Sequence, residues 1–418
     1  MRRSNALLAL GFGLCVVTQS RELAAQSHRI IEVRPGRAPS IAEAVRSAQP
    51  GDRIAIGRGV YREPTIVVDR PLTIVGEPGA ILDGGAATHI LRIEADSVTV
   101  RGLEFRRVTT SHVEDRAAIR VGAVTACRIE DNRILDAFFG IYLAGSQRCV
   151  IARNELRGTG ASEDQTGNAI HLWTARDVEI DDNRMSGHRD GIYLEFAHGT
   201  VVRGNVAEAN VRYGLHFMSS EDCRYERNVF RRNGAGVAVM YSKRVAITGN
   251  TFDDNRSASA YGLLLKEVYD AELTANRFTA NTIALYADGA TRLRADGNLF
   301  RDNGWAVKLM ASTERAELTG NVFLGNSFDL STNSRGSDAR VAGNYWDEYR
   351  GYDLDRDGRG DVPHRPVRLF SLIVERNEPT LVLLRSPLVA ILDRAERVVP
   401  SLTPETLQDV SPLMRRPR

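Results

Sequence analysis

The sequence has few cysteines, little net charge and few long apolar runs. It carries 4 cysteines, and its formal charge is +2 over 418 residues. With no basic run interleaved with aromatic residues, nucleic acid is not expected as a partner. After the first 20 or so residues, no apolar stretch approaches the roughly 18 residues that a membrane-spanning helix needs. The remaining chain is therefore expected to be soluble.

The N-terminal segment has the features of a cleavable secretory signal over residues 1–26. Arg2-Arg3 precedes an apolar stretch from Ala6 to Val17, and the small pair Ala24-Ala25 follows. About a dozen apolar residues are too few to span a bilayer. A twin-arginine signal and a lipoprotein box fit less well. We therefore expect export to the periplasm.

An asparagine recurs at a nearly constant interval through most of the chain. These residues are Asn132, Asn154, Asn183, Asn205, Asn228, Asn250, Asn276, Asn298, Asn321 and Asn344. The intervals between them are 22, 29, 22, 23, 22, 26, 22, 23 and 23 residues. Such a period predicts a solenoid made by stacking one supersecondary unit.

Side chains alternate between apolar and polar on both sides of each asparagine, which is the period of a β-strand. An example is Ile192 and Leu194, with Tyr193 and Glu195 between them. Two or three short strands in about 22 residues leave no room for a helix in each repeat. The prediction is an all-β, right-handed parallel β-helix over residues 27–350.

Features outside the strands complete this prediction. A second asparagine series, Asn210 to Asn326, marks another corner, and His188 holds the same position one coil earlier. Ser40 and Glu43 form a capping box that predicts a short helix over the first coil. Polar insertions at 110–116, 159–166 and 256–260 lengthen three repeats.

Three cysteines remain after the signal, and all lie five residues before a ladder asparagine. We therefore expect Cys127, Cys149 and Cys223 to point into the core. Buried thiols are the favoured interpretation. A Cys127–Cys149 disulfide between adjacent coils and a sulfur or metal role remain open.

The outward positions of the later strand form two columns rich in aromatic, histidine and methionine side chains. Five of them lie on neighbouring coils: His171, Glu195, His216, Met218 and Met240. Such a stripe usually indicates a docking face for carbohydrate or protein. Imidazole with thioether ligands also suits copper, particularly Cu(I), which gives the sharper hypothesis.

An aspartate-rich segment over residues 351–366 follows the last coil. Oxygen ligands fall at loop positions 1, 3, 5 and 9, and a backbone carbonyl is available at position 7; the residues are Asp353, Asp355, Asp357, Asp361 and Arg359. This is the front of a calcium loop, although His364 at position 12 excludes an EF-hand. A structural Ca²⁺ and a solvated turn are the two readings.

The C-terminal segment, residues 367–418, contains one amphipathic helix pattern. It runs from Ser386 to Arg397 and is followed by a proline-rich tail. Docking to a partner and covering the last coil are equally good interpretations of this segment.

The C-terminal text resembles the NosD family of periplasmic maturation proteins for nitrous oxide reductase. The resemblance is carried by Gly343-Asn344-Tyr345-Trp346-Asp347, Tyr352 to Asp361, Arg385 to Leu388, Asp393 to Glu396 and Pro412-Leu413-Met414. It implies a β-helix that works with an ABC transporter in assembling a copper–sulfide centre. The family is often described as copper-binding.

We therefore expect a non-enzymatic accessory protein that handles copper or sulfur. Its outward stripe would receive nitrous oxide reductase or a copper chaperone, and its C-terminal segment would dock on the ABC transporter. The alternative is a carbohydrate-binding or carbohydrate-active β-helix. Hydrolysis would need two carboxylates flanking one bond, and Glu195 and Asp288 are about four coils apart, roughly 19 Å.

Overall fold

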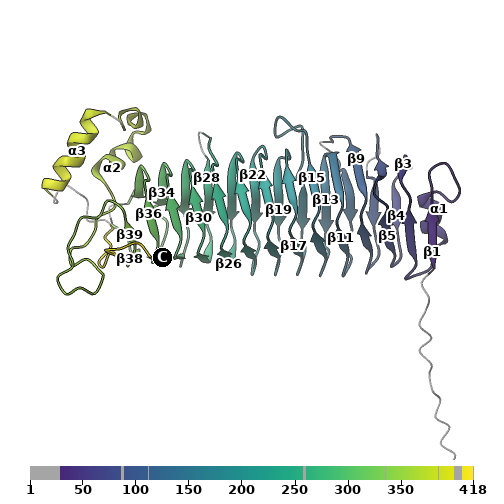
Figure 1. Cartoon of the computed structure of the whole chain (residues 1–418), viewed down its shortest axis with the longest axis horizontal. Helices are drawn as coiled ribbons and strands as arrows, with labels where there is room; N and C mark the ends of the chain where they lie inside the picture. Colours follow the sequence, from purple (N-terminus) through teal and green to yellow (C-terminus); the bar gives the residue numbers. More distant parts are fainter. Residues whose placement is uncertain are drawn as a thin grey trace, which may run out of the picture.

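The computed structural model describes residues 29–85, 89–111, 113–257, 260–334, 336–384, 386–399 and 407–417. The expected signal segment, residues 1–26, lies outside them. Short strands follow one another around each coil in the order sheet A, sheet B, sheet C, and each pairs in parallel with its equivalent in the next coil. Figure 1 shows the coils stacked along the long axis, with the C-terminal helices at one end. The parallel β-helix is confirmed.

Sheet A contains β1 (Ile30–Val33), β2 (Arg53–Ile56), β5 (Thr73–Gly76), β8 (Thr99–Arg101), β11 (Arg128–Glu130), β14 (Val150–Ala152), β17 (Glu179–Asp181), β20 (Val201–Arg203), β23 (Arg224–Glu226), β26 (Lys243–Thr248), β29 (Tyr269–Thr274), β32 (Arg294–Asp296), β35 (Glu317–Thr319) and β38 (Arg340–Ala342). Sheet B contains β3 (Gly59–Tyr61), β6 (Ala80–Asp83), β9 (Glu104–Val108), β12 (Arg133–Ala137), β15 (Glu155–Arg157), β18 (Arg184–Ser186), β21 (Val206–Glu208), β24 (Val229–Arg231), β27 (Thr251–Asp253), β30 (Arg277–Thr279), β33 (Leu299–Arg301), β36 (Val322–Leu324) and β39 (Tyr345–Trp346). Sheet C contains β4 (Ile66–Val68), β7 (Leu91–Ile93), β10 (Ala117–Val121), β13 (Phe139–Ala144), β16 (Ile170–Trp173), β19 (Asp190–Glu195), β22 (Tyr213–Met218), β25 (Ala235–Met240), β28 (Tyr261–Lys266), β31 (Ile283–Asp288), β34 (Trp305–Leu309) and β37 (Phe328–Ser331).

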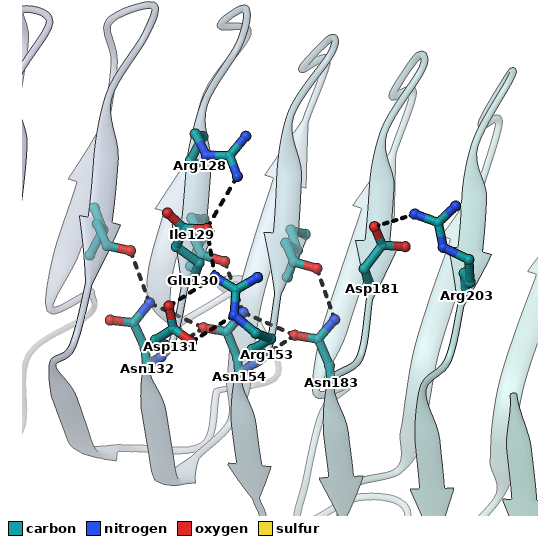
Figure 2. Close-up of polar contacts among 12 residues, drawn as sticks. Arg128, Ile129, Glu130, Asp131, Asn132, Arg153, Asn154, Asp181, Asn183 and Arg203 are labelled. Atoms are coloured by element: carbon teal, nitrogen blue, oxygen red, sulfur yellow. Dashed lines mark hydrogen bonds and ion pairs between the residues drawn. The ribbon is translucent and has the colours of Figure 1, made fainter.

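The asparagine ladder runs along the corner between sheets A and B. The Asn154 Oδ1 atom accepts hydrogen bonds from the backbone N–H and the side-chain amide of Asn132, at 3.0 and 3.1 Å. Asn183 accepts from Asn154 in the same way, at 2.9 and 3.0 Å, and Figure 2 shows these successive rungs. Because each amide is buried, this pairing removes the cost of an unsatisfied polar group at every corner.

Both asparagine ladders end on an aspartate. The Asp409 Oδ2 atom accepts from the backbone N–H and side-chain amide of Asn344, at 2.9 and 3.0 Å, and from Trp346 Nε1 at 3.0 Å. The second ladder ends where the Asn326 side-chain amide donates to Asp329 Oδ1 at 3.1 Å. Asp409 therefore closes the last coil from a distant part of the chain.

The core is filled by inward side chains that stack from coil to coil. The residue two positions after each ladder asparagine gives the series Phe230, Phe252, Phe278, Phe300, Phe323 and Trp346, all fully buried. Neighbouring ring centroids in this series lie 4.1 to 5.6 Å apart with nearly parallel planes. Each buried aromatic side chain contributes on the order of 2–3 kcal/mol of burial free energy.

The cysteine prediction needs a correction. Cys127 and Cys149 form a disulfide with their Cα atoms 4.5 Å apart, so the favoured reading of two buried thiols is wrong for this pair. Equivalent inward positions on adjacent coils bring the two sulfurs into bonding reach. Cys223 is a buried free thiol, and burial raises its pKa to about 12.

The two ends of the solenoid are closed differently. At the N-terminal end, α1 (Ile41–Ser47) begins at the predicted capping box of Ser40 and Glu43, which is confirmed. At the other end, α2 (Leu369–Arg376), the 3₁₀ helix η1 (Glu378–Leu383) and α3 (Pro387–Val398) follow the last coil. The predicted helix is α3; α2 was not predicted. No helix in the described part of the chain is long and apolar enough to cross a membrane.

Helix α2 packs on the outer face of sheet C at its last two strands. The Phe370 ring lies 6.1 Å from that of Phe328, and the Lys308 ammonium lies 2.7 Å from the Glu375 carboxylate. The three insertions also border sheet C, because each lies between a sheet B strand and the following sheet C strand. Loops and helices therefore collect around one face of the solenoid.

Candidate functional site

The outer face of sheet C carries the predicted stripe. Parallel register places one column in the order Tyr142, His171, Tyr193, His216, Ala238, Leu264, Tyr286 and Lys308. The neighbouring column reads Ala144, Trp173, Glu195, Met218, Met240, Lys266 and Asp288. The register inferred from the sequence is confirmed for both columns.

Successive rings of the first column contact one another. Ring centroids lie 4.3 Å apart for Tyr142 and His171, which are stacked, 4.7 Å for His171 and Tyr193, which are tilted, and 4.9 Å for Tyr193 and His216, which meet edge to face. Tyr142, His171 and His216 are only 6, 9 and 7% exposed. These three side chains therefore face outward from the sheet but are mostly covered by their neighbours.

A polar network that the sequence did not reveal supports these rings. Asp190 is fully buried, and Arg212 donates from Nε and Nη2 to its two oxygens at 3.0 and 2.5 Å. Arg189 donates to Asn168 Oδ1 at 3.3 Å. These residues lie at or just before the starts of the sheet C strands, where the alternation of apolar and polar residues no longer predicts the direction of a side chain. The only feature of the sequence that could have pointed to them is that they come directly before the apolar residues of each strand.

The two histidines of the stripe are held in different ways. The His171 Nδ1 atom lies 3.0 Å from the Asn168 side-chain amide, whose oxygen faces Arg189. That arrangement makes Nδ1 an acceptor and leaves the proton on Nε2. The His216 Nδ1 atom lies 3.4 Å from the Arg212 Nη2 donor and 3.9 Å from Asp190 Oδ2, so Nδ1 is the acceptor and the ring proton lies on Nε2. The Nε2 atom is buried and has no hydrogen-bond partner among the described residues.

Both imidazoles are uncharged at neutral pH. Burial lowers the pKa of His171 to about 3, with Arg189 and Arg120 adding to the effect. Burial also lowers the pKa of His216 to about 4, although Asp190 opposes the change. A neutral imidazole is the form that binds metals. His216 fits that role better than His171 only in its other tautomer, with the proton on Nδ1 facing Asp190 and the unpartnered Nε2 free to bind.

The structure places all five predicted copper ligands on the four adjacent strands β16, β19, β22 and β25, but only four of them lie together. Glu195, Met218 and Met240 are register neighbours on β19, β22 and β25, and His216 lies two positions before Met218 on the same face. His171 is separated from His216 by the ring of Tyr193. The fifth ligand therefore belongs to a different part of the stripe.

The aspartate-rich segment forms a compact loop. Asp353, Asp355 and Asp357 each offer a carboxylate oxygen, and these atoms lie within 4.8 Å of one another. Asp361 accepts from the Leu354 backbone N–H at 2.7 Å, and Arg359 pairs in antiparallel fashion with Leu413. Three of the predicted oxygens thus converge at spacing suitable for a hard cation.

The C-terminal helices expose a set of large apolar side chains. The exposed fractions are 85% for Val382, 54% for Leu388, 65% for Ile391 and 76% for Val398. On the other side of α3, Val389 is buried against α2 and the end of sheet C. An exposed apolar helix face on a folded domain marks an interaction surface.

Comparison with known proteins agrees with these features. A family model described as "Periplasmic copper-binding protein (NosD)" matches residues 157–351. A protein of Pseudomonas aeruginosa named "Probable ABC transporter binding protein NosD" is 31% identical over 84% of this chain and 86% of its own. One of the same name from Stutzerimonas stutzeri is 27% identical over 84% of each chain.

Solved structures share the architecture at low sequence identity. The DFA-IIIase of Arthrobacter chlorophenolicus A6 in complex with GF2 has a TM-score of 0.57 at 13% identity, covering 70% of this chain and 94% of its own. The A-module of the mannuronan C-5 epimerase AlgE6 of Azotobacter vinelandii has a TM-score of 0.52 at 18% identity, covering 71% and 85%. These likenesses show the fold alone. The level and extent of identity to the P. aeruginosa protein show that the chain belongs to the NosD family.

Proposed function

We propose that this protein is a periplasmic accessory factor for assembly of the copper–sulfide centre of nitrous oxide reductase. It would act with an ABC transporter and without catalysing a reaction itself. The observation that supports the proposal most directly is the neutral His216 imidazole beside Met218 and Met240, on the face that the loops and helices border. The names printed for the family model and the relatives agree with copper and with a transporter partner.

The proposed copper site consists of the two thioethers and the His216 Nε2 atom, which would bind after the ring proton moves to Nδ1, on the side of Asp190. Soft sulfur with imidazole favours Cu(I), and Asp190, behind His216, could orient the ring from the second coordination sphere. Glu195 lies beside Met218 and would border the site. In this proposal His171 remains a hydrogen-bond donor to an incoming partner, because Asn168 occupies its Nδ1 atom.

A Cu(I) titration under anaerobic conditions with a colorimetric competitor tests this site. The wild-type protein is expected to bind one equivalent, and His216→Ala combined with Met218→Ala should weaken binding at least about tenfold, as ligand losses commonly do. His198→Ala is the matched control, because His198 lies in the exposed corner beside sheet A and pairs with Asp222 at 3.0 Å. Unchanged affinity in the double variant would remove the site.

The role in assembly is tested in cells that lack the native gene. Nitrous oxide reductase purified from such cells should lack its copper–sulfide centre by metal analysis and visible absorption. The wild-type gene should restore it, and the His216/Met218 double variant should not. Full restoration by that variant would separate copper binding from the assembly function.

The ABC transporter is proposed to dock on the apolar face of the C-terminal helices. Leu388→Glu combined with Ile391→Glu would place charges on that face, and a pull-down from solubilised membranes should then lose the transporter. Val113→Glu is a suitable control, since Val113 is 95% exposed in the first insertion, far along the chain from the helices. Equal recovery of the transporter with both variants would place the contact elsewhere.

A structural Ca²⁺ is proposed for the aspartate loop. Chelation with EDTA should lower the melting temperature, and Asp355→Ala should abolish that sensitivity. Because the loop packs beside the segment that carries Asp409, its order supports the closure of the last coil. A melting temperature that is indifferent to EDTA would favour the solvated turn.

A further inference from the structure

A cavity of about 430 Å³ opens at the N-terminal end of the stripe. It is lined by residues of β7, β10 and the first insertion, among them His89, Arg92, Glu94, Glu114, Asp115 and Arg120. Its volume lies in the range of small-molecule sites, which is about 300–1,000 Å³. None of these residues belongs to the proposed copper site.

Arg120 is a preorganised cation in this cavity. Its guanidinium carbon lies 3.9 Å from the ring centroid of Tyr142, which fixes the plane of the side chain. The Nη1 atom is buried and makes no hydrogen bond, and the nearest carboxylate oxygen, on Asp115, is 4.0 Å away. A guanidinium edge that is desolvated and unpaired is costly unless a ligand supplies acceptors.

The other charged groups that line the cavity have partners of their own. Arg92 donates from Nη2 to Glu94, and Glu114 pairs with Arg116 at 3.3 Å. Both Arg92 and Arg120 keep unused donors, but Arg120 is the arginine whose guanidinium is held against a ring. Glu114 and Asp115 supply carboxylates to the lining.

His89 supplies a second donor. The backbone N–H of Ala117 donates to His89 Nδ1 at 3.2 Å, so the ring proton is on Nε2. Burial lowers the pKa of His89, and Arg120 and Arg92 lower it further, which keeps the imidazole neutral. The ring therefore donates one hydrogen bond and carries no charge.

A second cavity on the solenoid gives the contrast. It measures about 310 Å³ and is lined by Asp222, Arg244 and Asp270 among others. There Arg244 donates to Asp222 at 2.5 and 2.8 Å and to Glu221 at 2.7 Å. Arg244 is saturated by its own protein, whereas Arg120 is not.

We propose that the Arg120 cavity binds a small hydroxy-carboxylate. The ligand carboxylate would accept hydrogen bonds from the exposed part of the Arg120 guanidinium, whose side chain is 27% exposed, and from His89 Nε2, and its hydroxyl groups would donate to Glu114 and Asp115. A sugar acid has this combination of groups and fits the volume. It could be a free monosaccharide acid or the terminal uronate of a glycan. The site is independent of the proposed copper function.

Isothermal titration with D-glucuronate tests the proposal. Glucuronate should bind the wild-type protein, whereas glucose, which lacks the carboxylate, and acetate, which lacks the hydroxyls, should bind at least about tenfold more weakly. A uronate oligosaccharide that binds more tightly than the monomer would identify a glycan end as the source, and equal or weaker binding would identify the free acid. No heat with either uronate, or equal affinity for glucose, overturns the proposal.

The matched variants are Arg120→Met and Arg244→Met. Arg120→Met should abolish glucuronate binding while the Cu(I) titration stays at the wild-type value, and Arg244→Met should leave both unchanged. If Arg120→Met fails to fold, Arg120→Lys serves instead, because it keeps the charge and loses the planar fork, and it should weaken binding at least about tenfold. Wild-type affinity in the folded Arg120 variant rejects the site without touching the copper proposal.

Discussion

Sheets A and C are built from the same repeat, yet the charged side chains near their outer faces are paired in different environments. Along sheet A, arginines pair with carboxylates of the preceding coil, as Arg153 does with Asp131 and Glu130 (Figure 2). Both Arg153 and Asp131 keep 50% of their side-chain surface exposed. On sheet C, tyrosine and histidine rings pack against one another. The charged pair beside them is Asp190 with Arg212, and Asp190 is fully buried.

The outer faces of sheets A and C differ in how strongly each depends on particular side chains. An exposed pair on sheet A can exchange its partner for water at little cost, so many sequences would serve there. A buried carboxylate on sheet C has no such substitute and depends on Arg212. The insertions and the C-terminal helices also gather around sheet C. Burial, specific pairing and bordering loops are the reasons why we propose that the functional contacts of this protein lie on sheet C.

The largest contrast is expected between two aspartate substitutions. Asp190→Ala should lower the free energy of unfolding by about 3 kcal/mol, because it leaves a largely buried Arg212 without a counter-charge. Asp131→Ala should cost less than about 1 kcal/mol, because water can replace its exposed carboxylate. Chemical denaturation of both variants measures the difference. Equal losses would mean that the two faces are energetically alike.

The second-largest expected effect is a loss of stability in acid that comes from two histidines of sheet C. In the folded protein the pKa values of His171 and His216 are lowered to about 3 and about 4, so the unfolded chain takes up protons first. Their contribution is complete above the unfolded pKa of about 6.5 and is lost as pH falls toward the folded values, which amounts to about 2–3 kcal/mol for the two together between pH 7 and about pH 5.5.

Thermal denaturation across that pH range checks this expectation. Replacing both histidines with Phe should flatten the acid limb of the stability curve, and His198→Gln, at the exposed corner, should leave it unchanged. A wild-type acid limb in the double Phe variant would place the acid sensitivity elsewhere in the molecule.

A smaller effect of opposite sign is expected at the end of sheet C. Burial raises the pKa of Asp329 to about 7, so the folded protein holds this proton more tightly than the unfolded chain. Its stability contribution is present below pH 4 and is lost as pH rises toward 7. Asp329→Asn should therefore match wild type near pH 3 and be more stable than wild type by about 1–2 kcal/mol at pH 5. Equal stability of the variant and wild type at pH 5 would contradict this assignment.

The smallest expected effect is that of salt. Raising NaCl from 0.1 to about 1 M shortens the screening length to roughly 3 Å and weakens the exposed pairs of sheet A. The free energy of unfolding should fall by less than about 1 kcal/mol, since such pairs contribute little individually. Arg153→Ala should reduce this salt dependence, and Arg212→Ala should not. The reverse order would show that the sheet A pairs carry more energy than their exposure suggests.

Much of the fold was predictable because a solenoid repeats one local pattern. The ladder asparagines, the inward phenylalanines and the register of Tyr193 with His216 all follow from a period near 22 residues. The helix α1 followed from its capping box. These features depend on neighbours in the sequence or at a fixed interval, which is the information that a single chain supplies.

Contacts that lack this regularity were missed. The pairing of Arg212 with Asp190 starts outside the alternating positions, so nothing in the strand pattern indicated it. The ring of Tyr193 lies between His171 and His216. This arrangement depends on side-chain rotamers, which the spacing of residues in the sequence does not give. Helix α2 has no side-chain cap and is only 8 residues long, and it is held by Phe328 and Lys308 on the solenoid.

The role of Asp409 has a consequence for how the chain reaches its final form. Coils near the amino end can stack as soon as they emerge, but the last rung waits for a residue that lies 65 positions beyond Asn344. Until then β38 presents an open edge, a template on which another chain can pair. The last coil can therefore close only after the chain has been synthesised as far as Asp409. A chain that ends before this residue would keep an unpaired edge strand, which is prone to aggregation and open to recognition by chaperones or proteases.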